Sequence, residues 1–279
     1  MPAGSVFFLS DYGRRDEFVG VVHAVLVRHA PGCTVVDLTH EVPPFDVRAG
    51  AGTLARCVPH LGPGVVLAVV DPGVGGDRRG VVLDAGPDAP VGPRYFVGPD
   101  NGLLVPATDV AGGTAAAYAL SGSREGAATF DGRDLFAPVA AALLWGESPA
   151  ALGEPFDPAS LVRLAPPVVE TDRLSDGRSQ LRSEVTAVDR FGNVQLAAAG
   201  DSVPADVPMV LVSVDRGGGE APDSASAQLA RCVRTFADLA PDEFGLLVDG
   251  AGQLAVVARE DSASARLGAR AGMLVDLLW

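Results

Sequence analysis

Lysine is absent from this chain of 279 residues, and all 21 basic residues are arginine. The absence excludes Schiff-base chemistry, a phosphate-loop lysine and a kinase-type lysine. Positive charge is also scarce, because 35 acidic residues give a formal net charge of -14. Nucleic acid backbones and anionic membrane surfaces are bound by clustered cations, so these partners are disfavoured. We expect a small-molecule ligand, and a cationic one suits the charge.

Cysteine is also scarce. The chain has three, an odd number, far apart and without zinc or disulfide spacing: Cys33, Cys57 and Cys232. This usage is typical of a reducing cytosol. The first residues lack a basic segment followed by an export-length apolar stretch, and no run approaches the roughly 18 apolar residues of a membrane span. We therefore predict a cytoplasmic protein.

Metal and triad signatures are missing as well. The four histidines form no metal pair, and His23 and His29, six residues apart, fall on different helix faces: His23, His29, His40 and His60. No Gly-x-Ser-x-Gly elbow is present, so no serine triad is proposed. The sequence suggests neither a metal nor an organic cofactor.

What the chain does contain is 48% hydrophobic and 20% charged residues, the composition of a folded globular protein. In the first half, short apolar runs alternate with helix-like stretches. This alternation predicts an α/β domain with buried strands. Strands are expected at 6–10, 34–38, 65–70, 81–83 and 95–97, and helices at 18–30, 47–58 and 136–145.

The composition changes around residues 146–180, which are rich in Pro, Gly, Asp and Ser and are typical of a linker. Beyond them, alternating segments lie between turns, at 183–189, 208–215, 243–250 and 253–260. This pattern predicts a small β-barrel or sandwich. The fold class is therefore α/β, with an N-terminal α/β sandwich domain over 1–165 and a C-terminal small β-barrel-like domain over 170–279.

The stretch VVDPGVGGDRRG at 69–80 is the first candidate for chemistry. It lacks the phosphate-loop pattern, and a strand rather than a helix follows it. One interpretation is a glycine-rich hairpin with Asp71 in the turn and Arg78 and Arg79 in solvent. The other starts from Asp71, which directly follows a buried strand, where open α/β sheets bind ligands.

Four other acidic segments have a structural and a functional interpretation. Asp11 follows the first strand, where acids commonly hold ribose hydroxyls, whereas helix capping suffices for Asp16. Asp100 belongs to an Asp-Asn-Gly turn and is assigned a structural role. The segment TFDGRDLFAP (129–138) is either a helix start, with Asp134 in its first turn, or a ligand contact. The segment VDRFGNVQ (188–195) is either a hairpin bulge or a ligand contact.

Six ordered segments together resemble the S-adenosylmethionine hydroxide adenosyltransferases, hydrolases related to fluorinases and chlorinases: SDYGRRDEFVG, THEVPPFDVRAG, VVDPGVGGDRRG, YFVGPDNGLL, TFDGRDLFAP and DRFGN. The resemblance covers nearly the whole chain. It implies a homotrimer with the ligand between neighbouring subunits, and no cofactor. It also implies attack of a water-derived nucleophile on the ribose C5′ of S-adenosylmethionine, giving adenosine and L-methionine.

The family's hydrolytic trio is Asp, Arg and His, and its first two members match Asp71 and Arg78. Where the family has histidine, this chain has Asp131. Three consequences are open. Asp131 replaces the histidine as a proton acceptor, or its charge repels hydroxide and leaves an S-adenosylmethionine-binding protein, or it is an introduced substitution.

The resemblance also assigns binding residues. The ribose would contact Asp11 and Phe45, the adenine Phe191, Phe236 and Asn193, and the methionine ammonium Asp189, with Asp16 as a further candidate. A halogenase, the third functional class, is disfavoured, because those relatives have neutral residues in place of the Asp and Arg and a long insertion after the loop. Here both charges remain and only a short segment, 84–94, follows.

Overall fold

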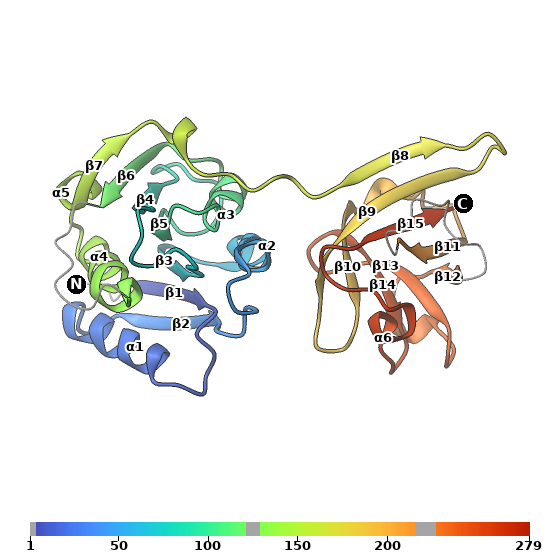
Figure 1. Ribbon diagram of the computed structural model, residues 1–279, viewed down its shortest axis with the longest axis horizontal. Helices are drawn as coiled ribbons and strands as arrows, with labels where there is room; N and C mark the ends of the chain where they lie inside the picture. Colours follow the sequence, from blue (N-terminus) through green and yellow to red (C-terminus); the bar gives the residue numbers. More distant parts are fainter. Residues whose placement is uncertain (1–3, 121–128, 216–226) are drawn as a thin grey trace. The chain divides into compact units, whose positions relative to one another are not determined.

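The computed structural model describes residues 4–120, 129–215 and 227–279. The chain divides into two compact units, Met1–Leu164 and Ala165–Trp279 (Figure 1). The expected boundaries were 1–165 and 170–279.

The N-terminal unit is built on a seven-stranded sheet in the order β2-β1-β3-β5-β4-β6-β7. Four strands are parallel: β1 (Ser5–Ser10), β2 (Thr34–Thr39), β3 (Gly64–Val69) and β5 (Tyr95–Pro99). Three pair antiparallel: β4 (Gly80–Asp84), β6 (Ala116–Leu120) and β7 (Gly153–Phe156). The five predicted strands are present, whereas β6 and β7 were not predicted.

Helices cover both faces of this sheet (Figure 1). Side chains alternate along β1, so Phe7 and Leu9 join the core under one pair of helices while Val6 and Phe8 join the core under the other. The first pair is α2 (Val47–Cys57) and α3 (Val105–Val110), and the second is α1 (Phe18–His29) and α4 (Ala137–Leu144). The predicted α/β sandwich is confirmed.

Shorter helical segments complete this unit: η1 (Val58–His60), the π-helical η2 (Gly132–Phe136), α5 (Pro149–Leu152) and η3 (Pro158–Ser160). The helix predicted at 136–145 therefore starts earlier, as a π-helical turn that continues into α4. Single π-helical turns occur frequently at functional sites. Within the described ranges, no helix is long and apolar enough to cross a membrane.

The C-terminal unit is a closed barrel, which confirms the predicted β-barrel. Seven strands run in the order β10-β14-β13-β12-β11-β15-β9, and pairing of β9 with β10 closes the ring. They are β9 (Ser179–Val188), β10 (Val194–Ala199), β11 (Met209–Val214), β12 (Gln228–Cys232), β13 (Phe244–Val248), β14 (Gln253–Ala258) and β15 (Leu274–Leu278). Three short helices accompany them: η4 (Gly200–Ser202), η5 (Phe236–Asp238) and α6 (Ala263–Leu267).

The predicted linker at 146–180 is wrong over much of its length. Its first part forms α5 and β7, and β7 pairs with β6 at the edge of the N-terminal sheet. Its last part forms β8 (Val169–Arg173), which pairs with β9. Pro and Gly mark the turns between these short elements, and strand pairing rather than local composition decides their state.

Candidate active site in the N-terminal domain

The acidic residues of the candidate site leave the sheet at its carboxyl edge. Strands β1 and β3 are parallel neighbours with Ser10 opposite Val69, so Asp11 and Asp71 follow from the same edge. The chain passes from β1 to β2 on one side and returns to β3 on the other. Such a change of direction is where open α/β sheets bind ligands.

A cavity of about 530 Å³ opens at this edge. This volume lies within the range of small-molecule sites. Its walls come from the ends of β1 and β3, the loop before α2 and the start of η2, and include Asp11, Tyr12, Phe18, Pro44, Phe45, Asp71, Phe130, Asp131 and Arg133. Four of the predicted residues, Asp11, Phe45, Asp71 and Asp131, therefore line one cavity.

Arg78 joins two of these carboxylates. Its Nε donates to both oxygens of Asp71, at 3.1 and 2.9 Å, and its Nη2 donates to Asp71 and to Asp131. The side chains of Arg78, Asp71 and Asp131 are only 10%, 4% and 1% exposed. The hairpin interpretation with a solvated Arg78 is therefore wrong.

The charge of Arg78 is fixed by this arrangement. Burial by itself lowers the pKa of its guanidinium, but hydrogen bonds and charges from Asp71 and Asp131 outweigh burial and raise the pKa above its usual value. Its guanidinium also lies 5.2 Å from the ring centre of Phe136. The cluster thus contains a permanent cation between two acids.

Asp131 immediately precedes the π-helical turn η2. The next charged residues in this segment pair with each other, because Arg133 donates to both oxygens of Asp134 at 2.6 and 2.7 Å. Asp134 lies in the first turn, as the helix-start interpretation expected. Asp131 is therefore the acid of this segment that the fold directs to Arg78.

Tyr12 belongs to the site and was missed by sequence reasoning. It lies next to Asp11, and its ring makes edge contacts with Phe8 and Phe130 and a tilted contact with Phe18, with centroids 6.3, 5.7 and 5.8 Å apart. Burial, with the charges of the neighbouring aspartates, raises the pKa of its phenol far above the usual value. The phenol is thus a neutral hydrogen-bond donor in an acidic site. The aromatic residue beside Asp11 was the available signal.

Asp11 holds the loop before α2. Its Oδ2 accepts the backbone N–H of Phe45 at 2.9 Å, and Phe45 has a left-handed backbone with φ of 68°. Such strain costs a non-glycine residue about 1–3 kcal/mol and concentrates at functional sites. Phe45 lines the cavity and is 72% exposed. Asp16 is exposed and is not the capping residue, because the N-cap of α1 is Glu17, which makes no side-chain capping bond.

The Asp-Asn-Gly turn that begins at Asp100 has the expected structural role, because its side chains bond to neighbouring segments of the fold. The Asp100 carboxylate accepts Arg79 Nε at 2.8 Å and the N–H of Val162 at 2.9 Å. Asn101 Nδ2 donates to the carbonyl of Val70 at 2.8 Å. These bonds tie the end of β5 to β3, so Arg79 braces the sheet edge while Arg78 enters the site.

A second cavity, of about 790 Å³, lies in the C-terminal domain. It brings together three predicted residues, Phe191, Asn193 and Phe236, and it is also lined by the run Arg259–Ser262. Phe191 is 72% and Phe236 is 47% exposed. Exposed aromatic rings at a cavity suit a flat aromatic ligand.

Asp189 organises the turn next to this second cavity. Its Oδ1 accepts the N–H groups of Phe191 and Asn193, at 2.9 and 3.0 Å, and its Oδ2 accepts Asn193 Nδ2 at 2.8 Å. Among the residues that the structure describes, no donor binds the amide oxygen of Asn193. Gly192 has φ of 84°, and Ser262 fills the space that a side chain would need.

The spacing of the histidines along the sequence predicted no metal pair, but the fold brings two of them to one carboxylate. His23 and His40 lie against the same carboxylate, that of Asp37. This group lies outside the residues that line either cavity. Sequence spacing misses it because the residues meet only when α1 packs beside β2.

These sites define a class of two-domain protein, with a charged cluster at the edge of an α/β sandwich and an aromatic cavity on a β-barrel. The chain belongs to the SAM hydroxide adenosyltransferase family. The models of that family's N-terminal and C-terminal domains match residues 6–153 and 183–276.

Curated relatives are similar over nearly the full length. A protein of Salinispora tropica named (R)-S-adenosyl-L-methionine hydrolase is 44% identical over 97% of this chain and 96% of its own. One of the same name from Thermus thermophilus is 39% identical over 98% and 99%. A fluorinase of Actinoplanes sp. is 28% identical over 70% and 72%.

A solved structure has a similar fold over nearly the full length. The crystal structure of an uncharacterized conserved protein from Thermotoga maritima has a TM-score of 0.82 and 32% sequence identity. It covers 98% of this chain and 99% of its own.

Proposed function

We propose that this chain hydrolyses S-adenosyl-L-methionine to adenosine and L-methionine. The observation that carries the proposal is the buried guanidinium of Arg78, which binds Asp71 and Asp131 at once. The names of its full-length relatives support hydrolysis of S-adenosyl-L-methionine. The acidic chain, with a net charge of -14, also suits a sulfonium substrate.

In the proposed reaction, the oxygen of a water attacks ribose C5′ as the bond from C5′ to sulfur breaks. The bonding electron pair moves to sulfur, so methionine leaves as a neutral thioether and needs no general acid. The attacking water must lose a proton. The site therefore has to hold one water in line, stabilise its developing negative charge and accept its proton.

Arg78 and Asp131 fit these tasks. Arg78 cannot lose its proton, so it would stabilise a developing hydroxide without competing for the proton. Asp71 would position Arg78 through both of its oxygens. Asp131 is the second acid on the same guanidinium, and we propose it as the proton acceptor in place of the family histidine.

The proposed substrate contacts use both cavities. The ribose hydroxyls would meet Asp11, with Phe45 beside the ring. The adenine would lie between Phe191 and Phe236, with the Asn193 oxygen accepting from its amino group. Asp189 and Asp16 are less supported as ligands, because Asp189 is already bonded within its turn and Asp16 does not line the N-terminal cavity.

Three further features complete the proposal. The relatives' names specify the (R) form, and since L already fixes the amino-acid carbon, (R) refers to the sulfonium centre, so we propose that epimer as substrate. We also propose a homotrimer, with the ligand bound where neighbouring subunits meet. A cytoplasmic location is supported by three free thiols.

The test is to incubate purified protein with each sulfonium epimer, with and without chloride, and to separate the nucleosides by chromatography. Adenosine from the (R) epimer regardless of chloride is expected, while a chlorinated nucleoside would indicate a halogenase. Asp131→Asn should lower turnover by about 10²–10⁴-fold. Its matched control is Asp134→Asn, which changes the other aspartate of this segment. Binding that raises the melting temperature without product would instead identify a binding protein.

A further inference from the structure

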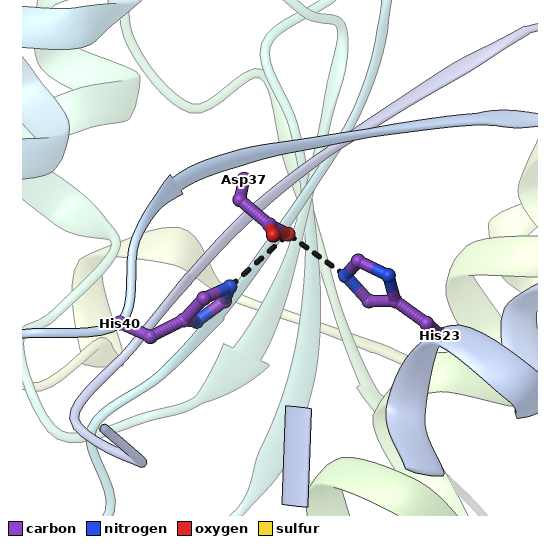
Figure 2. Close-up of side chains that lie close together, drawn as sticks. All are labelled: His23, Asp37 and His40. Atoms are coloured by element: carbon purple, nitrogen blue, oxygen red, sulfur yellow. Dashed lines mark hydrogen bonds and ion pairs between the residues drawn. The ribbon is translucent and has the colours of Figure 1, made fainter. Parts of the chain in front are cut away.

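Two histidines and an aspartate meet beside the N-terminal sheet, outside the reaction site (Figure 2). Asp37 Oδ1 lies 2.8 Å from His23 Nε2 and 3.0 Å from His40 Nε2. One ligand atom from each residue falls within 4.8 Å of the others. His23 comes from α1, Asp37 from β2, and His40 from the residue after β2. Figure 2 shows both rings turned toward the carboxylate from opposite sides.

His40 is held in one orientation. It is 1% exposed, and its ring packs edge-on against Phe8 with centroids 4.6 Å apart. Its Nδ1 lies 2.8 Å from Ser10 Oγ. A hydrogen bond at one ring nitrogen fixes the tautomer and directs the other nitrogen, as in the outer shell of many metal sites.

Among the residues that the structure describes, buried His40 Nε2 has no partner at regular hydrogen-bond geometry. Although 3.0 Å separates its Nε2 from Asp37 Oδ1, the direction of the ring does not meet hydrogen-bond geometry. A buried ring nitrogen in this condition is costly unless another partner binds it. His40 Nε2 lies beside two other atoms that can bind a metal, His23 Nε2 and Asp37 Oδ1, which points to one ion bound by all three.

We propose that His23, Asp37 and His40 form a binding site for one divalent transition-metal ion, of which Zn²⁺ is the best match. Two imidazole nitrogens and one carboxylate oxygen are a common donor set for zinc. Ca²⁺ and Mg²⁺ fit poorly, because they require mainly oxygen ligands. With bonds of about 2.0–2.2 Å, a tetrahedral ion needs its ligands slightly farther apart than the two short distances here.

The site has an opening through which an ion would enter. The side chains of His23 and Asp37 are 33% and 28% exposed, whereas His40 closes the inner side. Three protein ligands leave the fourth tetrahedral position to water on the exposed side. A divalent ion together with two neutral imidazoles and one carboxylate has a net charge of +1.

A bound ion would brace the segment that carries the reaction site. It would join α1 to β2. His40 in turn contacts two residues of this segment: its Nδ1 lies against Ser10 Oγ, and its backbone carbonyl accepts the N–H of Gly13 at 2.7 Å. Residues between Ser10 and Gly13 include Asp11 and Tyr12. The ion would stabilise this segment from behind and take no part in the hydrolysis.

The test uses the full chain, freed of metal with a chelator, and titration with Zn²⁺ alone. We expect one ion per chain, and with Co²⁺ the intense visible bands of a tetrahedral site. His23→Ala should weaken binding by at least about tenfold. The control, His29→Ala, changes an exposed histidine on the same helix and should bind as the parent does.

Thermal unfolding gives a second readout that needs no substrate. Zn²⁺ should raise the melting temperature of the parent and of His29→Ala but not that of His23→Ala or Asp37→Asn. Equal Zn²⁺ affinity in the His23→Ala and His29→Ala variants would overturn the assignment, as would the lack of any one-to-one binding to the folded parent. Neither readout depends on S-adenosylmethionine, so the proposed hydrolysis stands or fails separately.

Discussion

The Tyr12 hydroxyl occupies the space that a side chain at Gly132 would need. A Cβ built on Gly132 overlaps this hydroxyl, and it would also lie 3.2 Å from Tyr12 Cζ. The backbone at Gly132 is helical, so glycine is required here for space and not for its conformational freedom. Tyr12 therefore packs directly on Gly132, the residue after Asp131, and the side chains of Tyr12 and Asp131 line the same cavity.

Gly132→Ala should lower the free energy of unfolding by about 1–3 kcal/mol, because the added methyl overlaps the phenol. Tyr12→Phe removes the overlapping oxygen and should recover much of this loss in the double variant. Urea unfolding of the four proteins measures the coupling. Gly20→Ala is the control, since open space surrounds Gly20 in α1, and it should be stabilising by about 0.5–1 kcal/mol. Additive effects of the two site changes would contradict the packing argument.

Arg78→Met should destabilise the fold by about 3–5 kcal/mol, because it leaves the buried carboxylates of Asp71 and Asp131 without their cation. The midpoint of urea unfolding measures the loss. Arg163→Met is the comparison, since Arg163 pairs with Asp109 where both side chains are 53% exposed, and it should cost less than about 1 kcal/mol. Similar losses in both variants would show that the Arg78 cluster contributes no more than a surface pair.

Asp131→His should raise turnover at neutral pH. An imidazole would stand where the resembled family has histidine, and its ordinary pKa lies nearer neutrality. The change would also remove one negative charge from the path of a developing hydroxide. Adenosine release under saturating substrate measures the effect, with Asp134→His as the control that adds a histidine elsewhere in the segment. An unchanged or lower rate would count against Asp131 as the position of the proton acceptor.

Tyr12 should remain protonated through the alkaline range in which exposed tyrosines ionise. Its folded pKa is raised by burial and by neighbouring aspartates, so folding favours the neutral phenol. The stability that this preference gives is complete below the unfolded pKa of about 10 and is lost as pH rises above it. Unfolding measured from about pH 9 to 11 should therefore show a steeper loss in the parent than in Tyr12→Phe. Parallel curves would contradict the burial of the phenol.

Phe45→Gly should separate binding from stability. Glycine adopts the left-handed backbone of this position without strain, and the phenylalanine that it replaces is 72% exposed. The free energy of unfolding should therefore stay equal or rise by about 1 kcal/mol. If the ring lines the ribose site, KM should increase while the fold is kept. Phe45→Asn is the matched variant, because asparagine also tolerates this conformation. A fall in stability without a change in KM would assign the ring to packing alone.

The sequence by itself determined the elements with strong local patterns. Buried strands such as 65–70 and the helix at 18–30 follow from apolar periodicity, and the ordered motifs identified the family. Asp71 was a candidate because it directly follows a buried strand, whereas Asp131 was chosen because it stands where the resembled family has histidine. These properties are local, so the order of residues carries them.

Only the tertiary structure decided which side chains meet. Arg78 and Asp131 are 53 residues apart, and their contact depends on β4 and η2 packing at one edge of the sheet. Tyr12 joined the site, and His23 met His40 at Asp37, for the same reason. The strand β7 inside the predicted linker forms because β6 offers it a partner edge. Long-range pairing and packing set these outcomes, and no spacing along the chain encodes them.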